Sequence, residues 1–221
     1  FLISKNKIND EWNSLNIISN NASSVGNFDL EIYKNLDGNN EVLKKLKNHE
    51  YDIVYLLGQD NIRFQKKNEF IIYQGSHGDR IAQIADIILP SPAFTEQNGL
   101  YLNIEGRLQK SIKASYPPGI SKESWKIFNL ISTKINNRDL FKNFNELKNY
   151  TLKMIKKGYD FDLLPKTNIS NLNIINTDFV DNEILIKDID YYFSNSISRS
   201  SKTMSDCRAA RSKKLISKTG T

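Results

Sequence analysis

The chain has 221 residues, of which 39% are hydrophobic and 25% charged, a composition typical of soluble globular proteins. Its apolar runs are all shorter than the roughly 20 residues that a membrane-spanning helix needs. The formal net charge of +6 suits nucleic acid, an anionic membrane surface or an acidic protein as a partner. Charge alone does not choose among these three.

Metal-ligating residues are scarce. The sequence contains one cysteine, Cys207, and two histidines, His49 and His77. An iron-sulfur cluster or a structural zinc site needs about four ligands, most often thiolates or imidazoles. We therefore expect neither a metal site nor a disulfide framework formed within this chain alone.

The N-terminal quarter predicts two short helices. In residues 5–19, a polar cap at Asn9 or Asp10 precedes apolar residues at helical spacing. The segment 20–32 is rich in Asn, Ser and Gly, and no element is predicted there. Residues 39–48 then predict a second helix. The apolar positions of the two helices are Trp12, Leu15 and Ile18, and Val42, Leu43 and Leu46.

Three short apolar runs follow, at residues 52–57, 70–73 and 86–89, closed by Gly58, Gly75 and Pro90. Uninterrupted apolar runs of this length, bounded by turn residues, are typical of strands buried on both faces of a parallel sheet. Residues 79–85 predict one or two helical turns between the second and third runs. Strand, connection, strand, connection, strand indicates an α/β fold.

The second half of the chain changes from loops to helices and then to a tail. Residues 93–114 predict loops and short extended pieces, and the Pro117-Pro118-Gly119 turn closes them. Helices are predicted from Ser121, with a capping box, and over residues 139–155. Beyond Gly158 no helical period is sustained, so we predict an extended tail. The apolar helix positions are Trp125, Phe128, Leu130 and Ile131, and Leu140, Phe141, Phe144, Leu147 and Leu152.

The sequence Gly75-Ser-His-Gly-Asp79 lies at a predicted strand end. It has two functional interpretations, a loop that cradles phosphate and a catalytic pair of His77 with Asp79. The spacing matches neither a dinucleotide fingerprint nor a P-loop. We therefore favour a structural turn in which Gly75 and Gly78 supply positive φ angles.

Carboxylates and an arginine gather in the loop-rich stretch around residues 94–109. Glu96 and Glu105 could in principle form an acid/base pair. We favour a structural loop of Asn103, Glu105, Gly106 and Arg107, in which the Arg107 guanidinium holds a carboxylate or backbone carbonyls.

The tail carries a basic end and one aromatic cluster. Residues 208–218 could bind phosphates, but no aromatic side chains for base stacking are interleaved with them. Arg208 and Arg211 could lower the thiol pKa of Cys207, although a lone tail cysteine is usually incidental. Three adjacent aromatics on a polar segment favour burial. We predict that a docking segment anchors the tail to a partner through Tyr191, Tyr192, Phe193, Ile197 and Arg199.

Several blocks, in this order and spacing, resemble the C-terminal half of the large iron-sulfur subunits of respiratory complex I. The stretch 196–201, with Thr203, Met204 and Cys207, resembles the mitochondrial and α-proteobacterial form in particular. The likeness is weakest between residues 136 and 181. The blocks are IYQGSHGD at 72–79, IADIILP at 84–90, YLNIEGR at 101–107, PPG at 117–119 and SWKI at 124–127.

The resemblance implies a fold. The wider family is the molybdopterin oxidoreductases, in which a strand like residues 85–90 and a loop like residues 103–107 recur near the cofactor-binding core. The corresponding domain of the complex I subunit resembles a molybdoenzyme that has lost its cofactor. We expect a partial doubly wound α/β domain over residues 1–118, a helical segment over 119–158 and an extended tail over 159–221 that docks on partners.

The resemblance also implies a role. We expect a non-catalytic accessory part of the NADH-oxidising module of complex I, on the matrix side of the mitochondrial inner membrane. It would hold no cofactor, because the iron-sulfur clusters would lie on the N-terminal part of the subunit, which would be its partner. That part is absent here either because the gene is split into two polypeptides or because this sequence is only a portion of the chain. The other expected partners are peripheral-arm subunits. Nucleic acid is not expected, and membrane contact would be indirect.

Two alternatives stay open at the level of sequence. The chain could be the C-terminal part of an active molybdopterin oxidoreductase, which would hold a pterin. It could instead be a basic nucleic-acid-binding module, whose affinity would fall steeply with salt.

Overall fold

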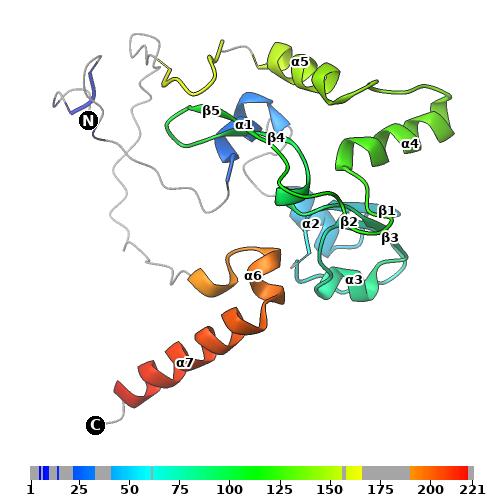
Figure 1. Cartoon of the computed structure of the whole chain (residues 1–221). Coiled ribbons are helices and arrows are strands. Elements are labelled where there is room, and N and C mark those ends of the chain that lie inside the picture. Colours follow the sequence, from blue (N-terminus) through cyan, green and yellow to red (C-terminus); the bar gives the residue numbers. More distant parts are fainter. Residues whose placement is uncertain are drawn as a thin grey trace. The chain divides into compact units, whose positions relative to one another are not determined.

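The computed structural model describes residues 5, 7–9, 14, 22–32, 41–60, 62–155, 158–165 and 190–218, with side chains as far as residue 212 (Figure 1). The chain forms two compact units, each assembled from three separate segments. The boundaries predicted at residues 118 and 158 do not coincide with those of the units. Unit 1 contains Phe1–Asn39, Asn98–Ile112 and Phe141–Ile184, and unit 2 contains Asn40–Gln97, Lys113–Leu140 and Leu185–Thr221.

Unit 2 is built on a three-stranded parallel sheet of order β1-β2-β3. The strands are β1 (Ile53–Leu57), β2 (Phe70–Gly75) and β3 (Ile87–Pro90). Ile, Val, Phe and Tyr supply most of their side chains, and these residues favour the extended backbone. The three predicted strands and their parallel arrangement are confirmed.

One face of this sheet carries the main core. Helix α2 (Glu41–Lys47), at a position predicted from sequence, contributes Leu46, and the short helix α3 (Arg80–Ile84) contributes Ile81. The core residues of the sheet alternate along the strands, because successive strand side chains point to opposite faces. They are Val54, Leu56, Ile71 and Tyr73.

The opposite face of the sheet is only partly covered. Here the ring of Tyr55 stacks on Phe128 of α4 (Ser124–Asn136), with 5.6 Å between centroids. On the same face Ile53, Phe70 and Ile87 are exposed. Gln74 is buried on this face, but the exposed residues show that the prediction of two buried faces is wrong for this part of the sheet.

Asp86 joins β2 to the start of β3. Its Oδ2 accepts a 2.7 Å hydrogen bond from the backbone N–H of Ile71, and its Oδ1 accepts one from Lys66 Nζ. The bond from Lys66, with the one from Ile71, lowers the pKa of Asp86. The ionised carboxylate is thus the form that the folded sheet prefers.

This pKa shift predicts a pH dependence of stability. A carboxyl group whose pKa is lowered in the folded state contributes stability above its unfolded pKa, and this contribution is lost as the pH falls through the folded value. We expect Asp86→Asn to unfold at a lower temperature than wild type at pH 7. The difference should shrink as the pH falls below about 4, because the unfolded chain is protonated there first and the folded chain only at its lower pKa. Thermal unfolding followed from pH 7 to 3 measures it, and a difference independent of pH would contradict the expectation.

The two helices predicted in the middle of the chain both exist, but each begins later than predicted. Helix α4 begins at Ser124, and Glu123 does not close a capping box on Ser121 but accepts a 2.7 Å bond from the Trp125 indole. Helix α5 (Phe144–Met154) begins after Asn143, whose side chain caps the N–H of Glu146. In both helices the apolar stripe was visible in the sequence, and the local hydrogen bonds fixed the start.

Unit 1 contains a β-hairpin where loops and short extended pieces were predicted, and a short helix in a segment for which no element was predicted. Strands β4 (Gly99–Leu102) and β5 (Leu108–Ser111) pair antiparallel, and α1 (Ser24–Asp29) lies against β4. The Ser23 hydroxyl accepts a 3.1 Å bond from the N–H of Leu102. Farther along, the N–H of Asp162 donates to the carbonyl of Leu108. Leu102 and Leu108 are buried as a result of these contacts.

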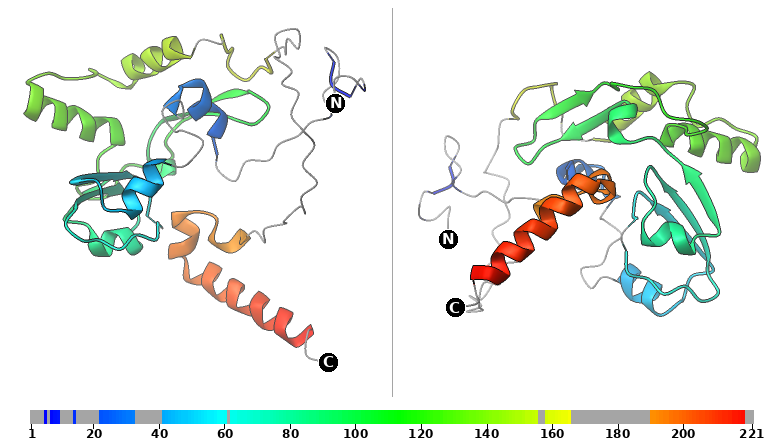
Figure 2. Two further views of the ribbon diagram at one scale, coloured as in Figure 1. Left: turned by 180° about the vertical axis from the view of Figure 1, so that it is seen from behind. Right: turned by 60° about the horizontal axis from the view of Figure 1, so that its bottom comes forward.

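The C-terminal part of the tail is helical where an extended chain was predicted. The segments are η4 (Tyr191–Phe193), α6 (Ser196–Ser200) and α7 (Lys202–Lys218), and Figure 2 shows α7 as one continuous helix. Within the described residues, no helix has both the length and the apolar character to cross a membrane. The predicted helix at 5–19 lies mostly outside the described residues.

Candidate functional site

In unit 2 two acidic side chains follow the carboxyl ends of neighbouring parallel strands, which is where open α/β sheets bind their ligands. Asp60 lies three residues after β1 and is 6% exposed. Asp79 follows β2, and its side chain caps the first N–H of α3, that of Arg80. The third strand gives no acidic group at this edge in the described part of the chain.

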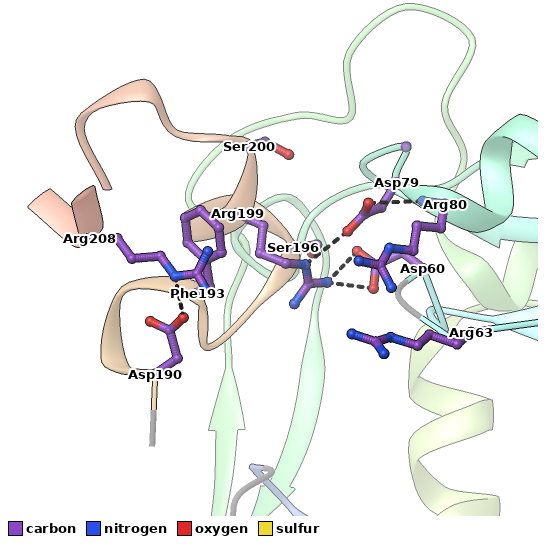
Figure 3. Close-up of a pocket in the computed structure, with 11 residues that line it drawn as sticks. Asp60, Arg63, Asp79, Arg80, Asp190, Phe193, Ser196, Arg199, Ser200 and Arg208 are labelled. Carbon is purple, nitrogen blue, oxygen red and sulfur yellow. Dashed lines mark hydrogen bonds and ion pairs between the residues drawn. The ribbon is translucent and has the colours of Figure 1, made fainter. Parts of the chain in front are cut away.

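Arg199 of α6 reaches both carboxylates (Figure 3). Its Nη2 lies 2.6 Å from each oxygen of Asp60, and its Nε lies 3.2 Å from Oδ2 of Asp79. The guanidinium therefore bridges two carboxylates that come from the ends of two strands. We call Asp60, Asp79 and Arg199 the edge triad.

The edge triad lies in a cavity of about 600 Å³. Arg63 and Arg80 also line this cavity, and both residues are exposed. On the tail side Arg208 is held by Asp190 at 2.6 Å, and its guanidinium lies 4.5 Å from the centre of the Phe193 ring. The wall of this cavity is therefore formed by residues that follow β1 and β2 together with residues of the tail.

The glycine-rich sequence after β2 forms a turn without the backbone conformation predicted for it. Positive φ occurs at Gly58, Gly106 and Gly119, and neither at Gly75 nor at Gly78. The constraint at Gly75 is volume, because a Cβ there would lie 2.1 Å from the hydroxyl oxygen of Tyr73. The prediction of a positive-φ turn was therefore wrong, and close packing explains Gly75.

His77 and Asp79, considered as a catalytic pair, each have other partners. Nδ1 of His77 lies 3.0 Å from the Ser76 hydroxyl, whereas the carboxylate of Asp79 accepts from Arg199 and from the Arg80 N–H. The carbonyl of His77 accepts a 2.6 Å bond from the Tyr73 hydroxyl. Burial raises the pKa of Tyr73 to about 12, so this phenol stays protonated near neutral pH.

The loop predicted at residues 103–107 closes the β4–β5 hairpin of unit 1. Oδ1 of Asn103 accepts from the N–H groups of Glu105 and Arg107, at 3.0 and 2.8 Å. Gly106 has φ +80, and a Cβ there would lie 2.7 Å from Pro165. Asn103 thus organises this turn, and the structural interpretation of the loop rests on backbone hydrogen bonds rather than on the Arg107 guanidinium.

Glu96, the other carboxylate considered for acid/base work, belongs to unit 2, whereas Glu105 belongs to unit 1. Glu96 accepts a 2.9 Å bond from the N–H of Ala93 at the start of η2 (Phe94–Glu96). Glu105 accepts one from the side chain of Asn103 at 3.2 Å. Each carboxylate therefore has a local structural partner.

The predicted docking segment is partly used within the chain. Arg199 is engaged by Asp60 and Asp79 of unit 2, and Ile197 lines a second cavity of about 310 Å³ together with Gly58, Gly75 and Ser91. Tyr191 is exposed, whereas Tyr192 and Phe193 are half-buried. The assignment of Arg199 to a partner contact stays a prediction, and within this chain its side chain binds Asp60 and Asp79 at the sheet edge.

The other side chains that could bind a metal, those of His49 and Cys207, do not belong to a cluster of metal-binding residues in the described part of the chain. Nδ1 of His49 pairs with the buried carboxylate of Glu69, and Cys207 is exposed. In the described ranges, no three His, Cys, Asp or Glu side chains gather as a metal site would require.

Sequence analysis did not identify Asp60, Arg63 or Arg80 as site residues. The only signal for Asp60 was its position, shortly after the glycine that closes a parallel strand. Its partner Arg199 was named, but for a different contact. No sequence pattern joins two residues that lie 139 positions apart.

Comparison with known proteins defines the class. The family model of molybdopterin oxidoreductases matches residues 1–134. The chain belongs to this family.

Relatives of the chain are named as subunits of NADH-ubiquinone oxidoreductases and NADH-quinone oxidoreductases. The chain is 36% identical, over 89% of its length, to the NADH-ubiquinone oxidoreductase 75 kDa subunit of Reclinomonas americana. It is 38% identical, over 93%, to a subunit of the NADH-quinone oxidoreductase of Rickettsia bellii, and 34%, over 93%, to the mitochondrial 78 kDa subunit of Neurospora crassa. These matches cover 28 to 29% of the relatives, so the chain spans less than a third of their length. The resemblance inferred from the sequence blocks is confirmed.

The family name implies a molybdopterin, which is an anion because it carries a phosphate. The edge triad does not fit such a group. The buried carboxylate of Asp60 and the carboxylate of Asp79 would repel a phosphate, and the guanidinium nearest to them already donates to both. Arg63 and Arg80 line the same cavity with the opposite charge. The misfit therefore concerns the carboxylates of Asp60 and Asp79, which are suited to a cation that Arg199 supplies.

Proposed function

We propose that this chain is a structural part of NADH-ubiquinone oxidoreductase, respiratory complex I, and that it braces the polypeptide that carries the iron-sulfur clusters. The observation that carries the proposal is the identity of 34 to 38% over about nine-tenths of the chain to subunits named for that enzyme. Because the chain spans less than a third of those subunits, the rest of the enzyme's work belongs to other polypeptide segments.

The chemistry of the chain supports a role without a redox centre of its own. An iron-sulfur cluster is held by several thiolates, and the sequence has a single cysteine. The edge triad places carboxylates where an anionic pterin would need donors. Electrons would therefore pass through clusters on the N-terminal part of the subunit, and this chain would fix the surroundings of those clusters.

Exposed apolar surface on unit 2 supports a bracing role. Ile53, Phe70 and Ile87 are exposed on one face of the sheet. A separate groove of about 410 Å³ lies between β3 and α4, and it is lined chiefly by apolar side chains. Contiguous apolar surface of this kind marks a protein interface. The groove residues include Leu89, Ile120, Ile127, Leu130, Ile131 and Ile135.

The proposed setting follows from the relatives. The Neurospora protein is named as mitochondrial. We place the chain on the matrix side of the inner membrane, in the peripheral arm, with membrane contact only through the assembled enzyme. Its partners are the cluster-bearing polypeptide and neighbouring peripheral-arm subunits, and nucleic acid is not among them.

Native purification tests this proposal. An epitope-tagged chain, expressed in its own cells, should co-migrate on a native gel with a band that oxidises NADH, and the separated chain should contain neither iron nor molybdenum in stoichiometric amount. Ile53→Asp, at an exposed position of the sheet, should reduce co-migration several-fold, whereas Gln65→Asp, at an exposed polar position, should not. A chain that migrates alone, or that retains molybdenum, would overturn the proposal.

A further inference from the structure

Helix α6 lies along the carboxyl edge of the parallel sheet and meets it in two places. Arg199 enters the cavity that Asp60 and Asp79 line, and Ile197 lines the neighbouring cavity beside Gly75 and Ser91. A capping box at Asn195, whose side chain accepts from the N–H of Ser198, fixes the start of this helix. The helix therefore presents Arg199 from a defined position.

Burial makes the contact energetically significant. A carboxylate removed from water needs a counter-charge, and Asp60 is almost completely buried. The side chain of Arg199 is itself only 18% exposed, so the pair is shielded from solvent screening. A guanidinium can donate from several nitrogens in fixed directions, whereas a lysine ammonium is a single point charge. The two carboxylates thus match a guanidinium in number and in placement.

The other charged groups at the cavity leave this match intact. Arg208 pairs with Asp190, and its guanidinium lies over the ring of Phe193. Arg63 and Arg80 are exposed residues of the wall, whereas both oxygens of Asp60 accept from Arg199. Within the described side chains of this cavity, Arg199 is the cation that both Asp60 and Asp79 contact.

We infer that Asp60 and Asp79 form a guanidinium-binding site at the sheet edge, and that Arg199 is its internal ligand, which fastens the tail to the parallel sheet within unit 2. The inference does not rest on the proposed role in complex I, because it concerns contacts within one chain. It assigns to this edge of the sheet a cationic ligand in place of the anionic cofactor that the family name implies.

Chemical rescue in the full chain tests the inference. Arg199→Ala removes the atoms of an ethylguanidinium, and we expect the variant to show at least about 10-fold faster hydrogen exchange over residues 195–212, because the tail opens locally. Millimolar ethylguanidinium should bind the vacated site and restore protection in a saturable manner, since a ligand that binds the folded form stabilises it. Ethylammonium at the same concentration should restore little.

Two further variants make the result decisive. Arg63→Ala removes an arginine from the same cavity, and it should leave both the exchange of the tail and the response to ethylguanidinium as in wild type. Arg199→Lys keeps the charge but should lose most of the protection against hydrogen exchange. If Arg199→Ala does not fold, the exchange measured in Arg199→Lys tests the inference in its place. Wild-type protection in Arg199→Lys, or an Arg199→Ala variant that folds but is not rescued by ethylguanidinium, would overturn the inference.

Discussion

Replacing Ile71 by alanine is expected to lower the free energy of unfolding by about 2–5 kcal/mol, the range for truncating a fully buried Ile or Leu. Ile71 is 0% exposed and lies on β2, the central strand, where it packs among Val54, Tyr73 and Ile81. The truncation removes methyl and methylene groups from the hydrophobic core cluster on this face of the sheet. The neighbouring backbone is fixed by strand pairing on both sides, so the cavity cannot readily close. Denaturant unfolding of the purified chain measures the change.

Ile53→Ala is the matched control, because it makes the same truncation on the same sheet at a position that is 65% exposed. Its effect on the unfolding of the isolated chain should stay within about 0.5 kcal/mol. Equal losses for the two variants would mean that the assignment of the core to one face of the sheet is wrong. In the assembled enzyme the proposed function adds a second expectation, that Ile53→Ala weakens incorporation.

Replacing Gly75 by alanine is expected to lower the free energy of unfolding by about 1–3 kcal/mol, the usual effect of overpacking. The new Cβ would lie 2.1 Å from the hydroxyl oxygen and 2.4 Å from Cζ of Tyr73. The Tyr73 ring cannot move aside freely, since it is buried and its hydroxyl is bonded to the carbonyl of His77. Thermal and denaturant unfolding both report this loss.

A double-mutant cycle separates the steric cause from any other. In a Tyr73→Leu background the ring atoms nearest to the new methyl group are absent, so the further effect of Gly75→Ala should be smaller. Gly158→Ala serves as the control, because nothing lies within 4 Å of a Cβ at that position. If the effect of Gly75→Ala is the same with and without the tyrosine ring, then contact with Tyr73 is not its cause.

The three strands of the parallel sheet and helices α2, α3, α4 and α5 could be predicted because their signals are local. Runs of Ile, Val, Leu and Tyr favour an extended buried strand wherever they occur, and an apolar stripe with a 3.6-residue period indicates a helix. The sequence blocks at 72–79, 84–90 and 101–107 carried the family assignment. Helix starts were less accurate. Glu123 was interpreted as part of a cap, but it bonds to the Trp125 indole.

The helical tail was missed because its composition was given more weight than its propensity. Residues 202–218 are rich in Ser, Lys and Arg and have no broad apolar stripe, which suggested an extended chain. The same residues include Met204, Ala209 and Ala210, which are strong helix formers. A polar helix of this kind is formed without a broad buried face, and the exposed Arg208–Asp190 pair links it to the segment that precedes it.

The sequence by itself determined the family, the order of the parallel strands and of helices α2 to α5, and the lack of thiolates for a cluster, because each of these depends on residue identity or on neighbours along the chain. Only the tertiary structure decided which face of the sheet is buried and which residues form its carboxyl edge. Asp60 and Arg199 are 139 residues apart, and their pairing exists only because folding brings α6 to the end of β1. Burial then makes the contact specific, since a carboxylate withdrawn from water must be met by a cation.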